Sequence, residues 1–180
     1  MDLKEDAGIK TKKDITNRID NIIDKIGRGT AWLNFILIFI ILLQVILRYV
    51  FRRGLVTLEE LQWHLYGVGI MIGQCYAVIQ DSHIRLDLVH ERMSDKRKSQ
   101  VEIIGIIVLL LPLAIVGIIK GFELFSGSFR VNESSDSPTG LPLRWIIKSF
   151  VPIGFSLLAI SAVSKLISQI RLLKRLKKEK

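Results

Sequence analysis

Residues 31–50 read AWLNFILIFIILLQVILRYV, and this stretch decides the fold. Its strongly polar members are Asn34, Gln44 and Arg48 alone. Because a helix rises about 1.5 Å per residue, about 20 apolar residues cross the roughly 30 Å hydrocarbon core of a bilayer. The stretch therefore predicts a membrane-spanning helix.

Three further apolar stretches have the length of a membrane span. We expect these spans at about residues 61–79, 101–122 and 145–167. Strands are disfavoured because the stretches lack period-two alternation, and because a barrel strand needs only about 9–11 residues. The sequence thus predicts an all-α membrane protein whose four transmembrane helices occupy residues 31–168.

The composition also favours a membrane protein. Of the 180 residues, 49% are hydrophobic and 24% are charged. The charged residues lie between the apolar stretches, which disfavours both disorder and an ordinary soluble domain. The single cysteine, Cys75, excludes a disulfide framework and a CxxC metal or redox site. The net charge is +9, and because the basic residues flank apolar stretches we expect them to contact membrane lipids and not nucleic acid.

The distribution of Lys and Arg predicts the orientation of the chain. Nineteen of these residues lie in residues 1–30, 80–100 and 165–180, against six near the other two connections. Because cytoplasmic segments of membrane proteins are enriched in Lys and Arg, we expect both termini in the cytoplasm. Four spans also place the two termini on the same side of the membrane.

Three segments outside the spans are amphipathic or basic. Residues 1–30 form a cytoplasmic tail, and isoleucines recur at helical spacing over residues 15–26. This pattern predicts a short helix that lies on the inner membrane surface or packs under the bundle. Residues 83–93 predict a second interfacial helix. Residues 169–180 form a basic cytoplasmic tail that continues the fourth span.

Ionisable residues gather near the outer ends of the first two spans. Arg48 closes the first span, and Glu59 and Glu60 open the second after a short turn. Charged groups in a membrane are costly unless they are paired or face water, so we expect Arg48 to pair with Glu59 or Glu60 and to fix this hairpin. An ion or proton site is the alternative, but a relay needs carboxylates at mid-depth, which the spans lack.

The histidines give weak signals. His83, Asp87 and His90 are spaced so that one helix face could present them to a metal ion, yet this spacing is more often that of solvated side chains. A haem site is disfavoured because His64 lies near the outer end and His83 near the inner end. The sequence offers no nucleophile–base pair and no phosphate loop. We therefore expect no catalytic residue, no metal and no cofactor.

Small residues and prolines mark the spans. Gly69, Gly73 and Ala77 recur every four residues in the second span, which predicts close approach of a neighbouring helix. Pro112 and Pro152 are expected to kink the third and fourth spans.

The outer loop and two tryptophans are expected at the membrane surface. Residues 126–144 are rich in Gly, Pro and Ser, which favour turns. Trp145 follows this loop, and Trp32 lies at the start of the first span. We expect both rings to act as anchors at the membrane interface.

Five short motifs occur in an order that resembles a known family. The motifs are VILRYVF (45–51), LEEL (58–61), HIRLD (83–87), LPLRW (141–145) and VPIGF (151–155). Together they resemble the small membrane subunit of tripartite ATP-independent periplasmic (TRAP) transporters, the DctQ-like family. The resemblance covers roughly residues 32–166.

The resemblance implies a non-enzymatic subunit of an ion-gradient-driven transporter in the bacterial inner membrane. In such a transporter, a large membrane subunit carries the substrate and sodium sites. The small subunit packs against the large one and anchors it, and a periplasmic solute-binding protein docks on the outer surface of both. The substrates of the class are mostly organic acids.

The resemblance also suggests roles for individual residues. Five residues match recurring polar positions of the family and are expected to be structural or interfacial: Arg48, Glu59, Glu60, His83 and Asp87. Three further residues, in the outer connections, are the expected contacts for the solute-binding protein: Arg52, Arg53 and Arg144.

Two other classes of protein stay open as alternatives. A small tetraspan membrane oxidoreductase is disfavoured by the single cysteine and by the different depths of the histidines. A self-sufficient small transporter or channel is disfavoured because the spans lack a mid-membrane carboxylate.

Overall fold

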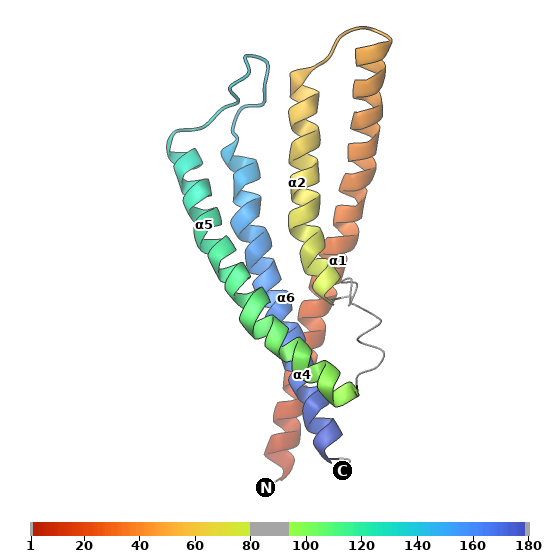
Figure 1. Ribbon diagram of the computed structural model, residues 1–180, viewed down its shortest axis with the longest axis vertical. Coiled ribbons are helices and arrows are strands. Elements are labelled where there is room, and N and C mark those ends of the chain that lie inside the picture. Colours follow the sequence, from red (N-terminus) through yellow and green to blue (C-terminus); the bar gives the residue numbers. More distant parts are fainter. Residues whose placement is uncertain (1, 80–93, 179–180) are drawn as a thin grey trace.

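The computed structural model describes residues 2–79 and 94–178. This part of the chain is helical and contains no strand. Its elements are α1 (Asp2–Tyr49), α2 (Val56–Ile79), α4 (Asp95–Gly105), the π-helical turn η1 (Ile106–Leu110), α5 (Leu111–Arg130) and α6 (Trp145–Lys178) (Figure 1). The all-helical fold class is therefore confirmed.

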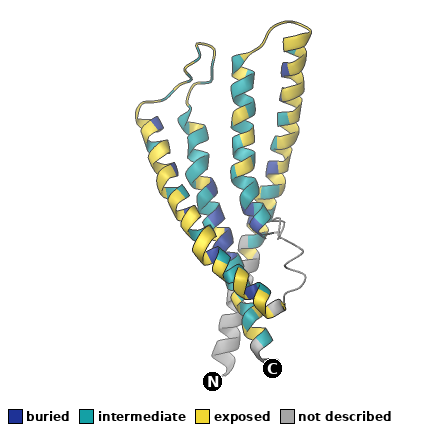
Figure 2. Cartoon of the chain, viewed as in Figure 1, coloured by how far each residue is buried: buried dark blue, intermediate teal, exposed yellow. Residues whose placement is uncertain are grey.

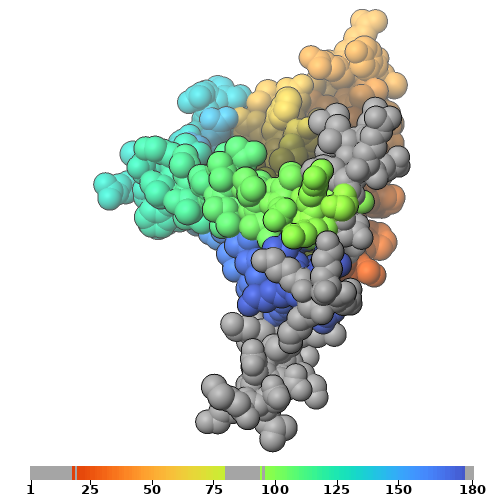
Figure 3. All heavy atoms as spheres, turned by 60° about the horizontal axis from the view of Figure 1, so that its bottom comes forward, coloured from red at the N-terminus to blue at the C-terminus, as the bar shows by residue number. Residues whose placement is uncertain are grey.

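The helices form two antiparallel hairpins that stand side by side. Residues 50–55 join α1 to α2, and residues 131–144 join α5 to α6, both at one end of the molecule (Figure 1). The start of α1 and the end of α6 lie at the other end. Because α2 packs against both α1 and α6, and α6 packs against α5, the helices follow the order α1, α2, α6, α5 across the molecule. α4, η1 and α5 run as one continuous band across α6 (Figure 3).

Three helical segments are long and apolar enough to cross a bilayer. They are Asp20–Tyr49, Lys96–Arg130 and Trp145–Leu176. α2 has 24 residues and so is about 36 Å long, but polar side chains such as Gln62 and Gln74 interrupt its apolar sequence. The four-span topology and the cytoplasmic side of the termini stay predictions.

The amphipathic segment before the first span is part of a longer helix. α1 runs without interruption from Asp2 to Tyr49, so residue 30 is not a helix boundary. Ile23 is only 3% exposed and belongs to the buried core. Gly27 lies so close to the ring of Tyr76 that an added Cβ would be 2.8 Å from the ring Cγ. The end of this segment thus packs against α2, as in the second of the two expected arrangements, and the segment continues into the first span instead of forming a separate helix.

The third span contains an irregular turn where the sequence predicts a kink. The π-helical turn Ile106–Leu110 ends just before Pro112, which occupies the first turn of α5. Proline has no backbone N–H and its ring crowds the preceding turn, so a locally widened turn removes the conflict. Pro152 lies inside α6 without ending the helix.

The close helix contacts do not involve the small residues expected to make them. An added Cβ would have nothing within 4 Å at Gly73, and at Gly69 it would meet only a side-chain oxygen of Asn34, 3.4 Å away. An added Cβ at Gly121 would instead lie 2.9 Å from the backbone N of Pro152. Within the chain, the glycines that let helices approach closely are therefore on α1, α5 and α6, and the packing role of the α2 stripe stays a prediction.

The core is small for a chain of this length. Its buried residues are Ile23, Cys75, Val78, Ala114 and Leu158. Most of the buried positions lie in the half of the molecule nearer the chain ends, whereas α1 and α5 expose apolar side chains along much of their length (Figure 2). Toward the loop end the helices stand in a row and bury little of their own surface, whereas nearer the chain ends α1 and α4 also pack against α6 (Figure 1). The exposed apolar faces are suited to lipid or to another membrane protein.

Candidate functional site

A polar network at the loop end of the molecule fastens the connection between α5 and α6 to α2. Its centre is the carboxylate of Glu60, in the first turns of α2. One oxygen accepts a hydrogen bond from the Ser135 hydroxyl, and the other accepts one from the backbone N–H of Leu141 at 2.6 Å. The Arg144 guanidinium also contacts Glu60, with 3.3 Å between Nη2 and Oε1. One carboxylate thus holds three points of the outer loop.

The loop folds locally so that this contact can form. Residues 137–140 read Ser-Pro-Thr-Gly, and the N–H of Gly140 donates to the Ser137 carbonyl at 3.0 Å. Serine at the first position, proline at the second and glycine at the fourth favour a type I turn. A Cβ at Gly140 would lie 2.9 Å from the Glu60 carboxylate, so the turn needs glycine there. Thr57 donates its hydroxyl to the Thr139 carbonyl at 2.5 Å and adds a second link to α2.

A second carboxylate joins the loop to the start of α6. The Lys148 ammonium donates to the Glu133 side chain. The backbone of Glu133 is also held, because it accepts from Arg144 N–H at 2.8 Å and donates to the Ser128 carbonyl at 3.0 Å. Leu143 has a positive φ of 59°, a conformation that costs a non-glycine residue free energy and persists where its surroundings fix it.

Both carboxylates are stabilised in the charged form. The hydrogen bond from Ser135, then the N–H of Leu141 and the charge of Arg144, lower the pKa of Glu60 below 4.5, against a smaller opposing effect of burial. The hydrogen bond from Lys148 lowers the pKa of Glu133 in the same way. The loop is therefore fastened by ionised groups at neutral pH.

The hairpin of α1 and α2 brings together two residues that the sequence singles out. Arg48 Nη1 lies 3.6 Å from Glu59 Oε1, while Glu60 is turned to the other loop. The two paired side chains are 64% and 44% exposed, so solvent or lipid headgroups screen the pair. Gln44 is buried and donates to the Leu55 carbonyl at 3.2 Å, which fixes the connection further.

The three expected docking arginines differ in what they contact. Arg52 and Arg53 are exposed at the tip of the α1–α2 connection, and Arg52 has a positive φ of 52°. Arg144 is only 31% exposed, because it pairs with Glu60 and lies 3.7 Å from Asp136. Arg144 thus holds the loop inside this chain, a use that the sequence did not indicate.

The tryptophans and the remaining polar positions are placed as follows. Trp145 packs edge-to-face on Phe129, with ring centroids 5.2 Å apart, where α5 ends and α6 begins. Trp32 is 71% exposed on α1. His83 and Asp87 lie outside the described residues. The anchoring roles of the tryptophans stay predictions.

A polar cluster at the opposite end was not foreseen. The Ser164 hydroxyl donates to Asp20 at 2.7 Å, which joins α6 to α1. Lys165 lies 3.7 Å from Glu102, and Gln169 donates to the same carboxylate at 2.7 Å, which joins α6 to α4. A small polar cavity of about 80 Å³ lies beside them. The sequence signal for this cluster is the run of polar residues Ser164, Lys165, Ser168 and Gln169 in the second half of α6.

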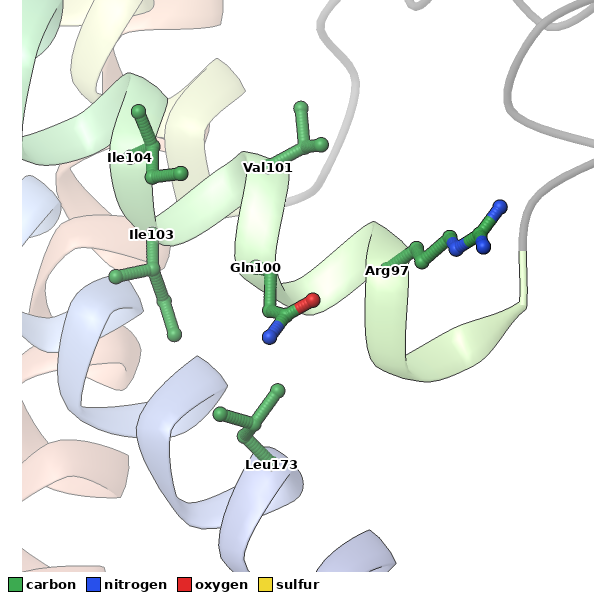
Figure 4. A pocket seen from close by; sticks show the side chains of 6 residues that line it. All are labelled: Arg97, Gln100, Val101, Ile103, Ile104 and Leu173. Atoms are coloured by element: carbon green, nitrogen blue, oxygen red, sulfur yellow. The ribbon is translucent and has the colours of Figure 1, made fainter.

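An open groove of about 520 Å³ lies between α4 and α6 near this cluster. Its side chains are those of Arg97, Gln100, Val101, Ile103, Ile104 and Leu173 (Figure 4). The Arg97 guanidinium points away from Leu173, so the groove is mainly apolar (Figure 4). It has no set of side chains that could perform acid–base chemistry.

Nothing in the described ranges resembles a metal or catalytic centre. Residues 2–79 and 94–178 contain no group of three His, Cys, Asp or Glu side chains that could hold a metal ion. Glu60, Asp20 and Glu102 bind loops or neighbouring helices, whereas Glu123 pairs with Lys120 of its own helix. The arrangement can fasten helices and present surfaces to other molecules.

The helical architecture and the exposed apolar faces are those of a membrane protein component whose surface contacts lipid or other membrane proteins. The family model described as tripartite ATP-independent periplasmic transporters, DctQ component, matches residues 37–172, and the chain belongs to this family. No curated protein and no solved structure matches the chain. The resemblance noted in the motifs is thus confirmed. The family is that of a small, generally non-enzymatic transporter component, which functions with a large membrane subunit and a periplasmic binding protein.

Proposed function

We propose that this chain is the small permease subunit of an ion-gradient-driven transporter for organic acids. It packs against the large transport subunit and anchors it in the inner membrane, with four spans and both termini in the cytoplasm. It also helps to dock the solute-binding protein at the loop end. The single observation that carries this proposal is the extended apolar surface of α1 and α5, which the other helices of the chain leave exposed.

Physical reasoning connects this architecture to an anchoring role. A large subunit that moves substrate across the bilayer needs a part that stays in place. A flat row of helices adds lipid-facing width to that part with few residues. The loops at the outer end are fastened by Glu60 and by the Glu133–Lys148 pair, so this end offers a defined surface to a periplasmic protein.

Purification from the native membrane tests the partnership. The tagged chain is extracted in mild detergent, and the co-purifying proteins are identified and quantified by mass spectrometry. We expect one large polytopic membrane protein at about equal stoichiometry. Recovery of the chain alone, or uptake of solute by the chain alone in liposomes, would overturn the proposal.

Charge reversal tests the docking surface. Arg52→Glu together with Arg53→Glu should reduce uptake that depends on the binding protein, because both residues are exposed at the tip of the first connection. Lys174→Glu with Arg175→Glu is the matched control, since these residues are exposed on α6 near the opposite end. Equal uptake by the two double variants would remove the docking role of the arginines.

A further inference from the structure

α5 carries a stripe of exposed residues along its length, on a side turned away from α6. The stripe consists of Leu113, Val116, Lys120, Glu123, Gly127 and Arg130, all exposed. The intervals between them alternate between three and four residues, which is the spacing by which two helices pack along a shared seam. Figure 2 shows exposed residues along the outer edge of α5.

The middle of the stripe is an ion pair surrounded by apolar side chains. Lys120 Nζ lies 2.8 Å from Glu123 Oε2, and the two side chains are 69% and 60% exposed. Val116, which precedes the pair on the stripe, and Leu124, next to Glu123, are exposed as well, at 56% and 47%. Both residues of the pair belong to the helical stretch Lys96–Arg130, which is long and apolar enough to cross a bilayer.

The contact of Trp145 with Phe129 lies at the loop end of α5, where Trp145 is expected to anchor the chain at the membrane interface. Lys120 precedes Phe129 by nine residues, so its Cα lies about 13 Å further along the helix axis. Ionisable groups at such depth almost always face protein or water, because lipid does not solvate them. Pairing reduces this cost but does not remove it, since both groups still lose their hydration.

We propose that this stripe is the surface against which the large membrane subunit packs a transmembrane helix. This inference rests on the proposed function and specifies which face of α5 contacts the large subunit. The facing helix carries a polar side chain opposite Lys120 and Glu123, which supplies further hydrogen bonds to the pair. An added Cβ at Gly127 would have nothing within 4 Å, so a neighbouring backbone can approach closely there.

A second copy of this chain is a poorer occupant of the stripe. Two copies inserted in the same orientation would pack in parallel about a two-fold axis, and equal positions would then face each other. Lys120 would meet Lys120 and Glu123 would meet Glu123. Like charges opposed in an apolar medium are unfavourable, so the occupant is a different chain.

Site-specific photo-crosslinking in intact membranes tests the face. A photoreactive amino acid replaces Val116 or Gly127 on the stripe, or Ile115 or Phe122 as controls. The controls are exposed on the same helix at similar depth but point to a different side. We expect adducts with the large subunit from the two stripe positions, and at most trace adducts from the controls. Adducts from the controls only, or adducts of the chain with itself, would overturn the inference.

A pair of variants tests the chemistry of the seam. Lys120→Met leaves the facing polar group without its partner, so recovery of the large subunit should fall about 3- to 30-fold, the range for interhelical polar contacts. Ile115→Met is the control and should leave recovery unchanged. If Lys120→Met recovers as much of the large subunit as the unmodified chain does, the stripe is not the contact surface, and the inference is overturned. Absence of any large subunit from the unmodified chain would instead refute the proposed function.

Discussion

Gly121→Ala should destabilise the protein although alanine is the better helix former. An added Cβ at this position lies 2.9 Å from the backbone N of Pro152 and 3.0 Å from Val151 Cγ1. These distances are well below ordinary contact, so α5 and α6 must move apart. The comparison is Gly73→Ala on α2, where an added Cβ meets nothing within 4 Å.

The expected difference can be estimated from two opposing terms. Both substitutions lie inside helices and gain about 1 kcal/mol of helix propensity. Overpacking at Gly121 costs about 1–3 kcal/mol, and Gly73→Ala has no such cost. The two variants should therefore differ by about 1–3 kcal/mol in the free energy of unfolding. For a chain of this size the difference corresponds to roughly 2–12 °C in Tm.

Thermal unfolding in mild detergent measures this difference. The fluorescence of the three tryptophans reports on the transition, and both variants are heated at one scan rate. We expect the Tm of Gly121→Ala to lie below that of Gly73→Ala. Equal transitions, or a higher Tm for Gly121→Ala, would refute the close packing of α5 on α6 at Pro152.

Three further predictions concern the loop network and the core. Glu60→Gln should make the outer loop more sensitive to limited proteolysis than Glu59→Gln does. The reason is that Glu60 contacts three points of the loop, whereas Glu59 pairs with Arg48. Equal cleavage of both variants would contradict this prediction. Acidification should expose the same loop. Folding lowers the pKa of Glu60 and of Glu133 below 4.5, so their ionised side chains stabilise the folded loop fully above that pH. This stabilisation is lost as the pH falls through the lowered pKa values of the folded state. Cleavage of the loop that sets in already at neutral pH would count against the network. Cys75 is fully buried, so it should resist a maleimide reagent until the protein is denatured; rapid labelling of the native protein would show that the core is open.

The sequence predicts contacts between neighbouring segments better than contacts across the chain. Arg48 and Glu59 are separated by a short turn, so their pairing follows from the hairpin. The choice of Glu59 over Glu60 does not follow, because Glu60 is taken up by Leu141 and Arg144, more than 80 residues away. Only the packing of α2 beside α6 brings these residues together.

The glycines that pack closely within the chain could not be identified from the sequence for a similar reason. Gly69 and Gly73 have the right spacing, but spacing alone does not say which face meets a neighbour. Gly27 follows the amphipathic segment, and the sequence does not show what it contacts. In the structure it accommodates the ring of Tyr76, and α1 continues through it. The partner of a small residue is set by the arrangement of the helices, which the local sequence does not encode.

The fastened outer loop has a consequence for the entropy of association. Binding to a flexible loop requires its backbone to be ordered, at a cost of about 1–2 kcal/mol for each residue fixed. The links from Glu60, Thr57 and Lys148 already hold residues 133–141 in one arrangement before any other protein arrives. A partner at this end meets a preorganised surface, so more of its contact energy is available as affinity.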